Sequence, residues 1–364
     1  MNAVQLAAFD ADIASGKYGL VDSMLVQRCG VTAIDRTYKR DYNSLYGERA
    51  KKAGPMNHDP KGEYNYFSTE FHPYFRHSDL HTMQSISKTV TSITIGVAMQ
   101  RKQFPVGLDT PIFKFFSAYK IANVDERKRR ITLRHLLTMT SGIEWHEDLA
   151  YDDPANSSDV MEGKREWVQY VIDQPMAHEP GTAFVYSGGD TELLAYIFLK
   201  VTGKQIDAYA DEHLFKPLGI THYHWKHSPT GLPDTQGGLF LAARDLAKIG
   251  TLFLKDGIWG GNAIVSDDWI RDSTAPHMTI GASNGKYGYQ WWLVPYGAAR
   301  DKFAWAAHGF GGQQLVIVPE YDLVAVFTGW DILPSSEPRR HDVLPRILSA
   351  VNQQHPCAVP AKPN

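Results

Sequence analysis

The chain has 364 residues, of which 43% are hydrophobic and 12% aromatic, so it can bury one large core or two smaller ones. This composition excludes a disordered or fibrous protein. Its 37 basic and 40 acidic side chains leave a formal charge of −3, which predicts neither a nucleic-acid partner nor attraction to an anionic membrane.

The sequence shows no clear targeting or membrane-spanning segment. Asp10 and Asp12 stand where a signal peptide needs an apolar run, and no stretch of the sequence is typical of a transmembrane helix. We therefore expect a cytoplasmic protein, or a secreted or periplasmic one if a leader was removed. The two cysteines, Cys29 and Cys357, can pair only if the termini lie together.

The first eighty residues predict two strands and a long connection. Leu20–Lys39 carries β-branched and apolar residues on both sides of a turn at Cys29 and Gly30, which is typical of a hairpin. From Tyr42 to Leu80 the chain is rich in Gly, Pro, His, Tyr and Asn without a clear period, which predicts an irregular connection over the surface.

The middle of the chain is mostly helical in pattern, because its apolar residues recur three and four positions apart. The predicted helices are Thr82–Gln100, Ile131–Thr138, Trp167–Asp173, Thr191–Thr202, Asp207–Phe215 and Ala242–Lys255.

Beyond about Tyr287 the pattern changes to short β-rich runs, which predict three or four antiparallel strands, and Asp342–Gln353 then predicts an amphipathic helix. Strands at both ends of a helical middle indicate an α/β (α+β) fold with one antiparallel sheet built from both termini. We expect a sheet domain of residues 1–90 and 265–364, a mostly helical domain of residues 91–264, and an active site at their interface. The predicted strands are Tyr289–Val294, Phe303–Ala307, Gln314–Val318 and Leu323–Thr328.

Ser85 and Lys88 form a Ser-x-x-Lys motif at the start of the predicted helix 82–100. Positions three apart share one helix face, so a desolvated Lys88 can lose its proton and activate the Ser85 hydroxyl as a nucleophile. The β-branched run Thr89–Ile95 favours a strand, but small or apolar residues on all sides indicate a buried helix. A second match, Ser117 and Lys120, lacks such a segment, and roughly one or two matches are expected by chance.

Six further motifs follow the first in a fixed order, and seven ordered matches are very unlikely by chance. With them the chain resembles the penicillin-recognising serine hydrolases, and within these the class C β-lactamase-like esterases and the 6-aminohexanoate-dimer hydrolases. The resemblance covers most of the chain and implies a β-lactamase/transpeptidase-like fold. The further motifs are ITLRHLLTMTSG (131–142), PGTAFVYS (180–187), LFKPLGI (214–220), ARDLAKIG (243–250), YQWW (289–292) and HGFGGQ (308–313).

The resemblance implies catalytic roles for Ser85, Lys88 and Tyr186. Ser85 attacks the substrate, Lys88 is the general base, and Tyr186 carries the proton to the leaving group. The last role needs a shifted pKa, which a neighbouring ammonium can provide to the Tyr186 phenol. Tyr186 matches the family's Tyr-x-Asn/Ser motif, but Gly188 stands at its third position.

The glycine-rich stretch 308–312 is placed by the resemblance where the family has Lys-Thr-Gly. With Gly309 at the family's glycine, the N–H groups of Ser85 and Phe310 form an oxyanion hole, which contributes about 3 kcal/mol per donor. Ala307 then takes the lysine position and His308 the hydroxyl position, whereas a shift by one residue puts His308 at the cation position. In both alignments the permanent cation is absent.

Three more side chains are expected to contact substrate. Tyr151 resembles a substrate-contacting tyrosine in a similar Tyr-x-Asp-Pro context. Gln236 stands where the family often has a polar pocket residue, although a surface turn explains it equally well. Trp291, with Trp292 and Phe310, is expected to offer an aromatic wall to an apolar acyl chain.

We expect no cofactor and no metal. His222, His224 and His227 form the one histidine-rich patch, but no carboxylate or cysteine pattern accompanies them.

Three functions compete. The first is a serine hydrolase that cleaves small carboxylic esters, or linear amides, through an acyl-enzyme on Ser85. The second is a β-lactamase or D-alanyl-D-alanine carboxypeptidase, which normally uses a cation to hold the substrate carboxylate. The third is a catalytically silent sensor that kept the fold. Substrate identity and oligomeric state are left open.

Overall fold

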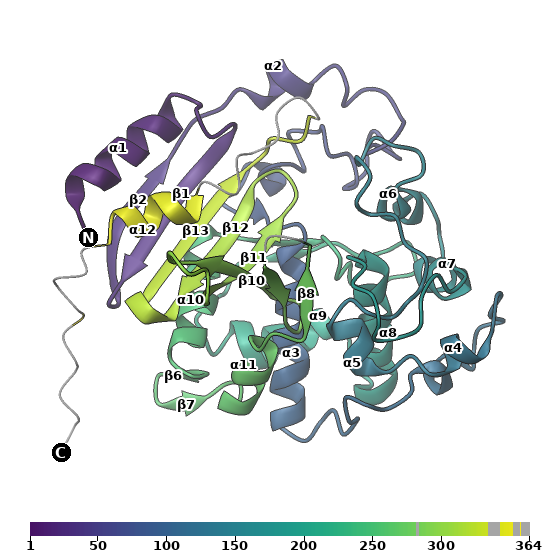
Figure 1. Cartoon of the computed structure of the whole chain (residues 1–364). Coiled ribbons are helices and arrows are strands. Elements are labelled where there is room, and N and C mark those ends of the chain that lie inside the picture. Colours follow the sequence, from purple (N-terminus) through teal and green to yellow (C-terminus); the bar gives the residue numbers. More distant parts are fainter. Residues whose placement is uncertain (282–283, 334–342, 352–356, 358–364) are drawn as a thin grey trace.

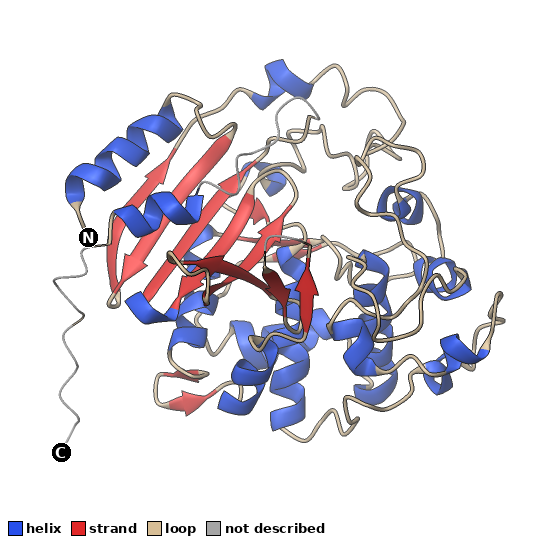
Figure 2. Ribbon diagram, in the orientation of Figure 1, coloured by secondary structure: helices blue, strands red, loops and turns tan. Residues whose placement is uncertain are grey.

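A computed structural model describes residues 1–281, 284–333, 343–351 and 357 (Figure 1). Its centre is an eight-stranded antiparallel sheet in the order β2-β1-β13-β12-β11-β10-β9-β8 (Figure 2). β1 from the N-terminal hairpin pairs with β13, with Leu25 opposite Val326, so the two ends of the chain share one sheet as predicted. The strands are β1 Val21–Arg28, β2 Val31–Thr37, β8 Met278–Ile280, β9 Gly285–Tyr287, β10 Trp292–Tyr296, β11 Lys302–Gly309, β12 Gln313–Val318 and β13 Leu323–Gly329.

The C-terminal half adds more strands than its pattern predicts. β8 and β9 pair with each other and extend the sheet beyond β10. The predicted strand at Tyr289 begins only at Trp292, because Gln290 adopts the left-handed conformation with φ 64° and breaks the extended run.

One face of the sheet is covered by α1 (Ala3–Ala14) and α12 (Val343–Ser349), which lie side by side (Figure 1). Phe9 and Ile347 pack there against alternate residues of β1 and β13, such as Met24 and Phe327. α1 is not among the predicted elements, although Leu6, Phe9 and Ile13 repeat at helical spacing. Asp342 and residues 352–353 of the predicted last helix lie outside the described residues.

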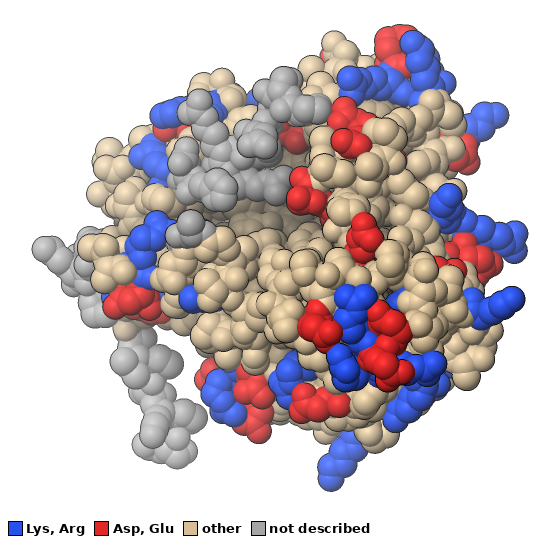
Figure 3. All heavy atoms as spheres, turned by 45° about the vertical axis from the view of Figure 1, so that its right-hand side comes forward, with Lys and Arg blue, Asp and Glu red and all other residues tan. Residues whose placement is uncertain are grey.

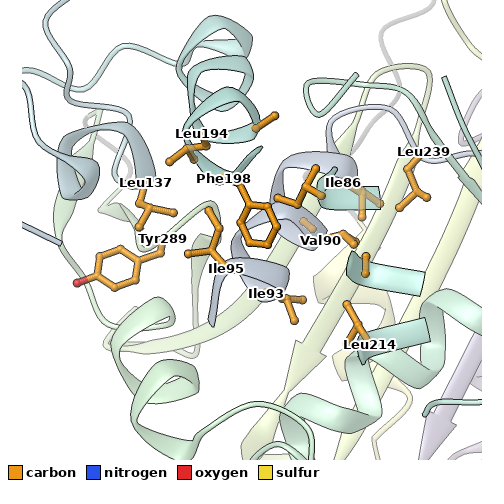
Figure 4. Close-up of a cluster of buried hydrophobic side chains, with 14 of the residues drawn as sticks. Ile86, Val90, Ile93, Ile95, Leu137, Leu194, Phe198, Leu214, Leu239 and Tyr289 are labelled. Carbon is orange, nitrogen blue, oxygen red and sulfur yellow. The ribbon is translucent and has the colours of Figure 1, made fainter. Parts of the chain in front are cut away.

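The other face carries α3 (Ile86–Gln100) and α10 (Ala243–Leu254), and beyond them the helical part of the chain. Thirteen of the fifteen residues of α3 are buried. The segment is therefore a buried helix, as its small and apolar residues indicate, although its β-branched residues favour a strand. Ile86, Val90 and Ile93 contribute to a continuous core (Figure 4). The other α-helices are α2 Tyr42–Tyr46, α4 Glu126–Arg129, α5 Leu133–Leu137, α6 Ser157–Glu162, α7 Trp167–Asp173, α8 Gly188–Thr202, α9 Ile206–Ala210 and α11 Asp267–Ser273.

The long connection between residues 42 and 80 is irregular apart from α2 and a short 3-10 turn at Phe75–His77. It leads into β3 (His81–Thr82), which pairs with β5 (Leu239–Leu241) beside β4 (His224–Trp225). This small sheet brings the segment around Leu239 next to the start of α3, since the N–H of Met83 donates to the carbonyl of Leu239 at 2.8 Å. A further two-stranded ribbon joins β6 Ile258–Trp259 and β7 Asn262–Ala263.

Cys29 and Cys357 form a disulfide with a Cα–Cα distance of 5.4 Å, which answers the question that the sequence left open. The disulfide joins the turn of the first hairpin to the C-terminal tail. Among the described residues, no helix is long and apolar enough to cross a membrane. The division of the chain at residues 90 and 265 stays a prediction, because one apolar core runs from α8 through α3 to the sheet.

Candidate active site

Ser85 is the N-cap residue of α3, and Lys88 lies on the first turn of the same helix. The Nζ atom of Lys88 lies 2.9 Å from the Oγ atom of Ser85, so the two side chains of the motif meet as predicted. Gln84, directly before Ser85, has φ 48°, a left-handed conformation that turns the chain sharply from β3 into α3. Ser117 and Lys120, the second Ser-x-x-Lys match, are exposed at the surface.

Lys88 is buried and has three acceptors for its three ammonium protons. Besides Ser85, it donates to the backbone carbonyl of Gln236 at 2.9 Å and faces Oε1 of Glu147 at 3.4 Å. Burial pushes the pKa of Lys88 down, but Glu147 and then Tyr186 outweigh burial, and the pKa lies above its usual value. The role of Lys88 as general base stays a prediction. In the resting site the buried carboxylate of Glu147 raises the pKa of Lys88 and so opposes the loss of its proton.

Glu147 belongs to this site but is not among the predicted site residues. Its buried carboxylate accepts hydrogen bonds from the Nε1 atom of Trp145 at 2.9 Å and the backbone N–H of Gly188 at 2.5 Å. Burial pushes the pKa of Glu147 up, but the charge of Lys88 and these donors hold it below its usual value. No local pattern marks Glu147, since it stands among other acidic residues in a loop.

Tyr186 directly precedes the start of α8, and its ring centroid lies 5.0 Å from the Nζ atom of Lys88. Burial raises the pKa of Tyr186, and the opposing effect of Lys88 does not cancel it. Lys88 thus lowers the pKa of Tyr186 as expected, but the larger effect of burial raises it. Both shifts of pKa favour the protonated forms, a phenol at Tyr186 and an ammonium at Lys88.

Gly188 departs from the family motif for a steric reason. A Cβ atom at this position would lie 2.3 Å from Oε1 of Gln236 and 3.1 Å from Oε2 of Glu147. The space of a side chain at the third motif position is therefore already filled by Gln236 and Glu147.

The end of β11 lies against the segment before Ser85. A Cβ atom at Gly309 would lie 2.3 Å from the carbonyl oxygen of Met83, so only glycine permits this approach. Within the described chain, the backbone N–H groups of Ser85 and Phe310 donate to no other group, which leaves both for a ligand. The oxyanion hole formed by these two groups stays a prediction, and this arrangement supports it.

Tyr151 and Phe310 form one wall of the site. Their ring centroids lie 4.4 Å apart, and both rings are half-buried. The Tyr151 hydroxyl donates to Oε1 of Glu147 at 3.2 Å, which ties this wall to the carboxylate beside Lys88.

Trp291 does not form the opposite wall. It has no exposed surface and packs on Phe253 in the core, with ring centroids 4.7 Å apart. Trp292 instead lies 5.4 Å from the ring of Tyr186 and 6.2 Å from that of His308. Neighbouring residues of an extended chain point to opposite faces, so of the two tryptophans expected in the wall only Trp292 lies beside Tyr186.

His308 and Gln236 occupy different surroundings. His308 lines, together with Trp292, a cavity of about 920 Å³ that is bounded mainly by apolar side chains of β10, β11, β12 and α12. Gln236 is buried, and its Nε2 atom donates a hydrogen bond to Glu162 at 3.0 Å, so its side chain has a partner within the protein. Its backbone carbonyl accepts the hydrogen bond from Lys88. His224 and His227 have separate carboxylate partners, Glu63 and Asp207.

On the face shown in Figure 3, basic and acidic side chains are intermingled around a hollowed centre, and neither sign dominates. The fold and the contact between half-buried Ser85 and buried Lys88 are the arrangement expected of the penicillin-recognising class of proteins. The chain belongs to the Beta-lactamase family, which residues 70–330 match.

Individual relatives are distant. The 6-aminohexanoate-dimer hydrolase of Paenarthrobacter ureafaciens is 24% identical over 272 residues, which cover 69% of this chain and 66% of that relative. A family VIII carboxylesterase aligns with a TM-score of 0.66 at 15% identity, covering 95% of this chain and 96% of its own. An octameric penicillin-binding protein homologue from Pyrococcus abyssi gives 0.64 at 19% identity, covering 96% and 78%. These structural matches support the β-lactamase/transpeptidase-like fold.

Proposed function

We propose that this protein is a carboxylesterase with amidase capacity that acts on small uncharged substrates through an acyl-enzyme on Ser85. The observation that carries the proposal is the 2.9 Å contact between Lys88 Nζ and Ser85 Oγ at the start of a buried helix. Labelling with a fluorophosphonate probe tests it. An active nucleophile gives one labelled peptide that contains Ser85, whereas an unlabelled protein supports the silent sensor.

The reaction starts when the Lys88–Tyr186 pair has lost one proton. Ser85 Oγ then forms a bond to the carbonyl carbon of the substrate while its proton passes to Lys88. As the bond to the leaving oxygen or nitrogen breaks, Tyr186 gives that atom a proton and regains one from Lys88. Water then attacks the acyl-enzyme by the reverse transfers and releases the acid.

Substrate preference follows from the absent cation beside Gly309. Ala307, which takes the position of the family's lysine, has no charged group that could hold a substrate carboxylate. The absence of a permanent cation at this position favours an uncharged ester over a penicillin or a peptide C-terminus.

We expect p-nitrophenyl butyrate to be hydrolysed at pH 8 with a kcat/KM about one to two orders of magnitude above that for nitrocefin. The reason is that a charge-assisted bond to a carboxylate contributes roughly 1.5 to 3 kcal/mol, and each 1.36 kcal/mol is about tenfold. A panel of p-nitrophenyl esters, linear amides and nitrocefin measures this. Equal efficiency on nitrocefin would favour the β-lactamase alternative.

Glu147→Ala is expected to destabilise the protein by about 3 to 5 kcal/mol, because it leaves the buried Lys88 ammonium without its carboxylate. Glu147→Gln should cost less, since an amide oxygen still accepts one of the hydrogen bonds. Urea unfolding measures both. The matched control is Glu144→Ala, whose side chain is 44% exposed, with an expected change within about 1 kcal/mol. Equal losses at both positions would contradict a structural role for the Lys88–Glu147 pair.

We also propose that the protein works in an oxidising compartment. This agrees with the secreted or periplasmic location, which is one of the two locations expected from the sequence. The disulfide between Cys29 and Cys357 supports this, because cytosolic thiols are generally kept reduced. Mass spectrometry of alkylated protein from the native host is the test. Two alkylated cysteines would favour the cytoplasm.

A further inference from the structure

Lys88 donates one of its hydrogen bonds to a carbonyl that no regular element holds in place. The acceptor, Gln236, lies in the turn of residues 235–237, which precedes β5. Residues 234–238 are all buried, so their polar groups need partners within the protein. The position of this carbonyl therefore depends on the contacts that anchor the turn.

A single carboxyl oxygen holds both backbone N–H groups at the start of this turn. Oε1 of Glu192 accepts hydrogen bonds from the backbone N–H of Thr235 at 2.7 Å and of Gln236 at 3.0 Å. The hydroxyl of Thr235 lies 3.0 Å from the same oxygen. Glu192 has no exposed surface, so water does not compete for these donors.

Glu192 also belongs to the helix that positions Tyr186. α8 begins directly after Tyr186 and Ser187, and its first residue, Gly188, donates to Glu147. Glu192 follows one turn later on the same rigid helix. One helix therefore sets the place of the Tyr186 ring and, through Glu192, the place of the carbonyl that receives Lys88.

The surroundings of Glu192 favour a neutral acceptor over an anion. Burial raises the pKa of Glu192, and the nearby carboxyl of Asp234 raises it further. Asp234 itself accepts from the N–H of Gly237 at 2.9 Å and faces Lys226 at 3.9 Å. The contribution of Glu192 to the turn is thus that of a hydrogen-bond acceptor, which an amide oxygen can replace.

We propose that Glu192 is a positioning residue for catalysis: its Oε1 holds the turn 235–237 so that the Gln236 carbonyl accepts a proton of Lys88 and keeps the ammonium beside Ser85 and Tyr186. This inference rests on the proposed function, because it assigns a role within the same reaction. It adds a residue that contacts neither substrate nor nucleophile.

The test compares Glu192→Gln with Glu192→Leu in the full-length protein, using p-nitrophenyl butyrate. Gln keeps the accepting oxygen, so kcat/KM should stay within about threefold of the wild type and the pH profile should not move. Leu removes it, and kcat should fall about 10- to 100-fold with a smaller change in KM. The acid limb of kcat/KM should also move to lower pH by about half a unit, since a lost hydrogen bond to the ammonium lowers the pKa of Lys88.

Two outcomes overturn the inference. One is a folded Glu192→Leu variant with the wild-type kcat and acid limb, and the other is a folded Glu192→Gln variant that loses as much as Leu. If Leu does not fold by thermal melting, Glu192→Met removes the accepting oxygen from a side chain of similar length, and a wild-type kcat and acid limb in that variant would then refute the role. Fluorophosphonate labelling of the wild type at Ser85 keeps this result separate from the proposed function.

Discussion

Ser85→Ala is expected to abolish ester hydrolysis, with a fall in kcat of roughly 10⁵-fold or more, because the variant has no atom that can form the acyl-enzyme. The free energy of unfolding should change by about 1 kcal/mol or less. The substitution removes only the Ser85 hydroxyl, and its hydrogen-bond partner Lys88 keeps two other acceptors. Initial rates on p-nitrophenyl butyrate and urea unfolding measure the two effects. Mass spectrometry of the wild type with a slow substrate should find the acyl group on the Ser85 peptide.

Ser117→Ala is the matched control, because it changes the exposed serine of the second Ser-x-x-Lys match. It should retain wild-type kcat and KM. Loss of activity in this variant, with retention in Ser85→Ala, would mean that the nucleophile was assigned to the wrong motif.

Lys88→Ala and Tyr186→Phe are each expected to lower kcat by about three to four orders of magnitude, and the double variant should lose little more than either single one. The two groups move the same protons, so removing one disables the other. The Nζ atom of Lys88 lies 5.0 Å from the ring centroid of Tyr186, close enough for such coupling. Losses that add in the double variant would show that the two residues act in separate steps.

The pH dependence of the wild type follows from the same pair. The pKa values of both Lys88 and Tyr186 are raised, so the form that has lost one proton is scarce at neutral pH and grows as pH increases. We therefore expect kcat/KM to rise with pH between about 6 and 9, the region below the raised pKa values. A flat profile over this range would remove Lys88 as the general base.

The sequence by itself determined the features that depend on neighbours along the chain. Ser85 and Lys88 meet because positions three apart share one face of a helix, and the buried pattern of α3 identified that helix despite its β-branched residues. The predicted helix Trp167–Asp173 matches α7, and the hairpin around Cys29 matches β1 and β2, since periodicity and turn residues are local signals.

Only the tertiary structure decided the charge of the site and the walls around it. The pKa of Lys88 lies above its usual value because Glu147, 59 positions away, faces its Nζ atom. The carbonyl of Gln236, 148 positions away, accepts a hydrogen bond from the same atom. Trp292 rather than Trp291 lies beside Tyr186, because the start of β10 sets which side chain faces the site. Burial and long-range charge determine a pKa, and sheet register determines which face a side chain occupies. Neither quantity is contained in the spacing of residues along the chain.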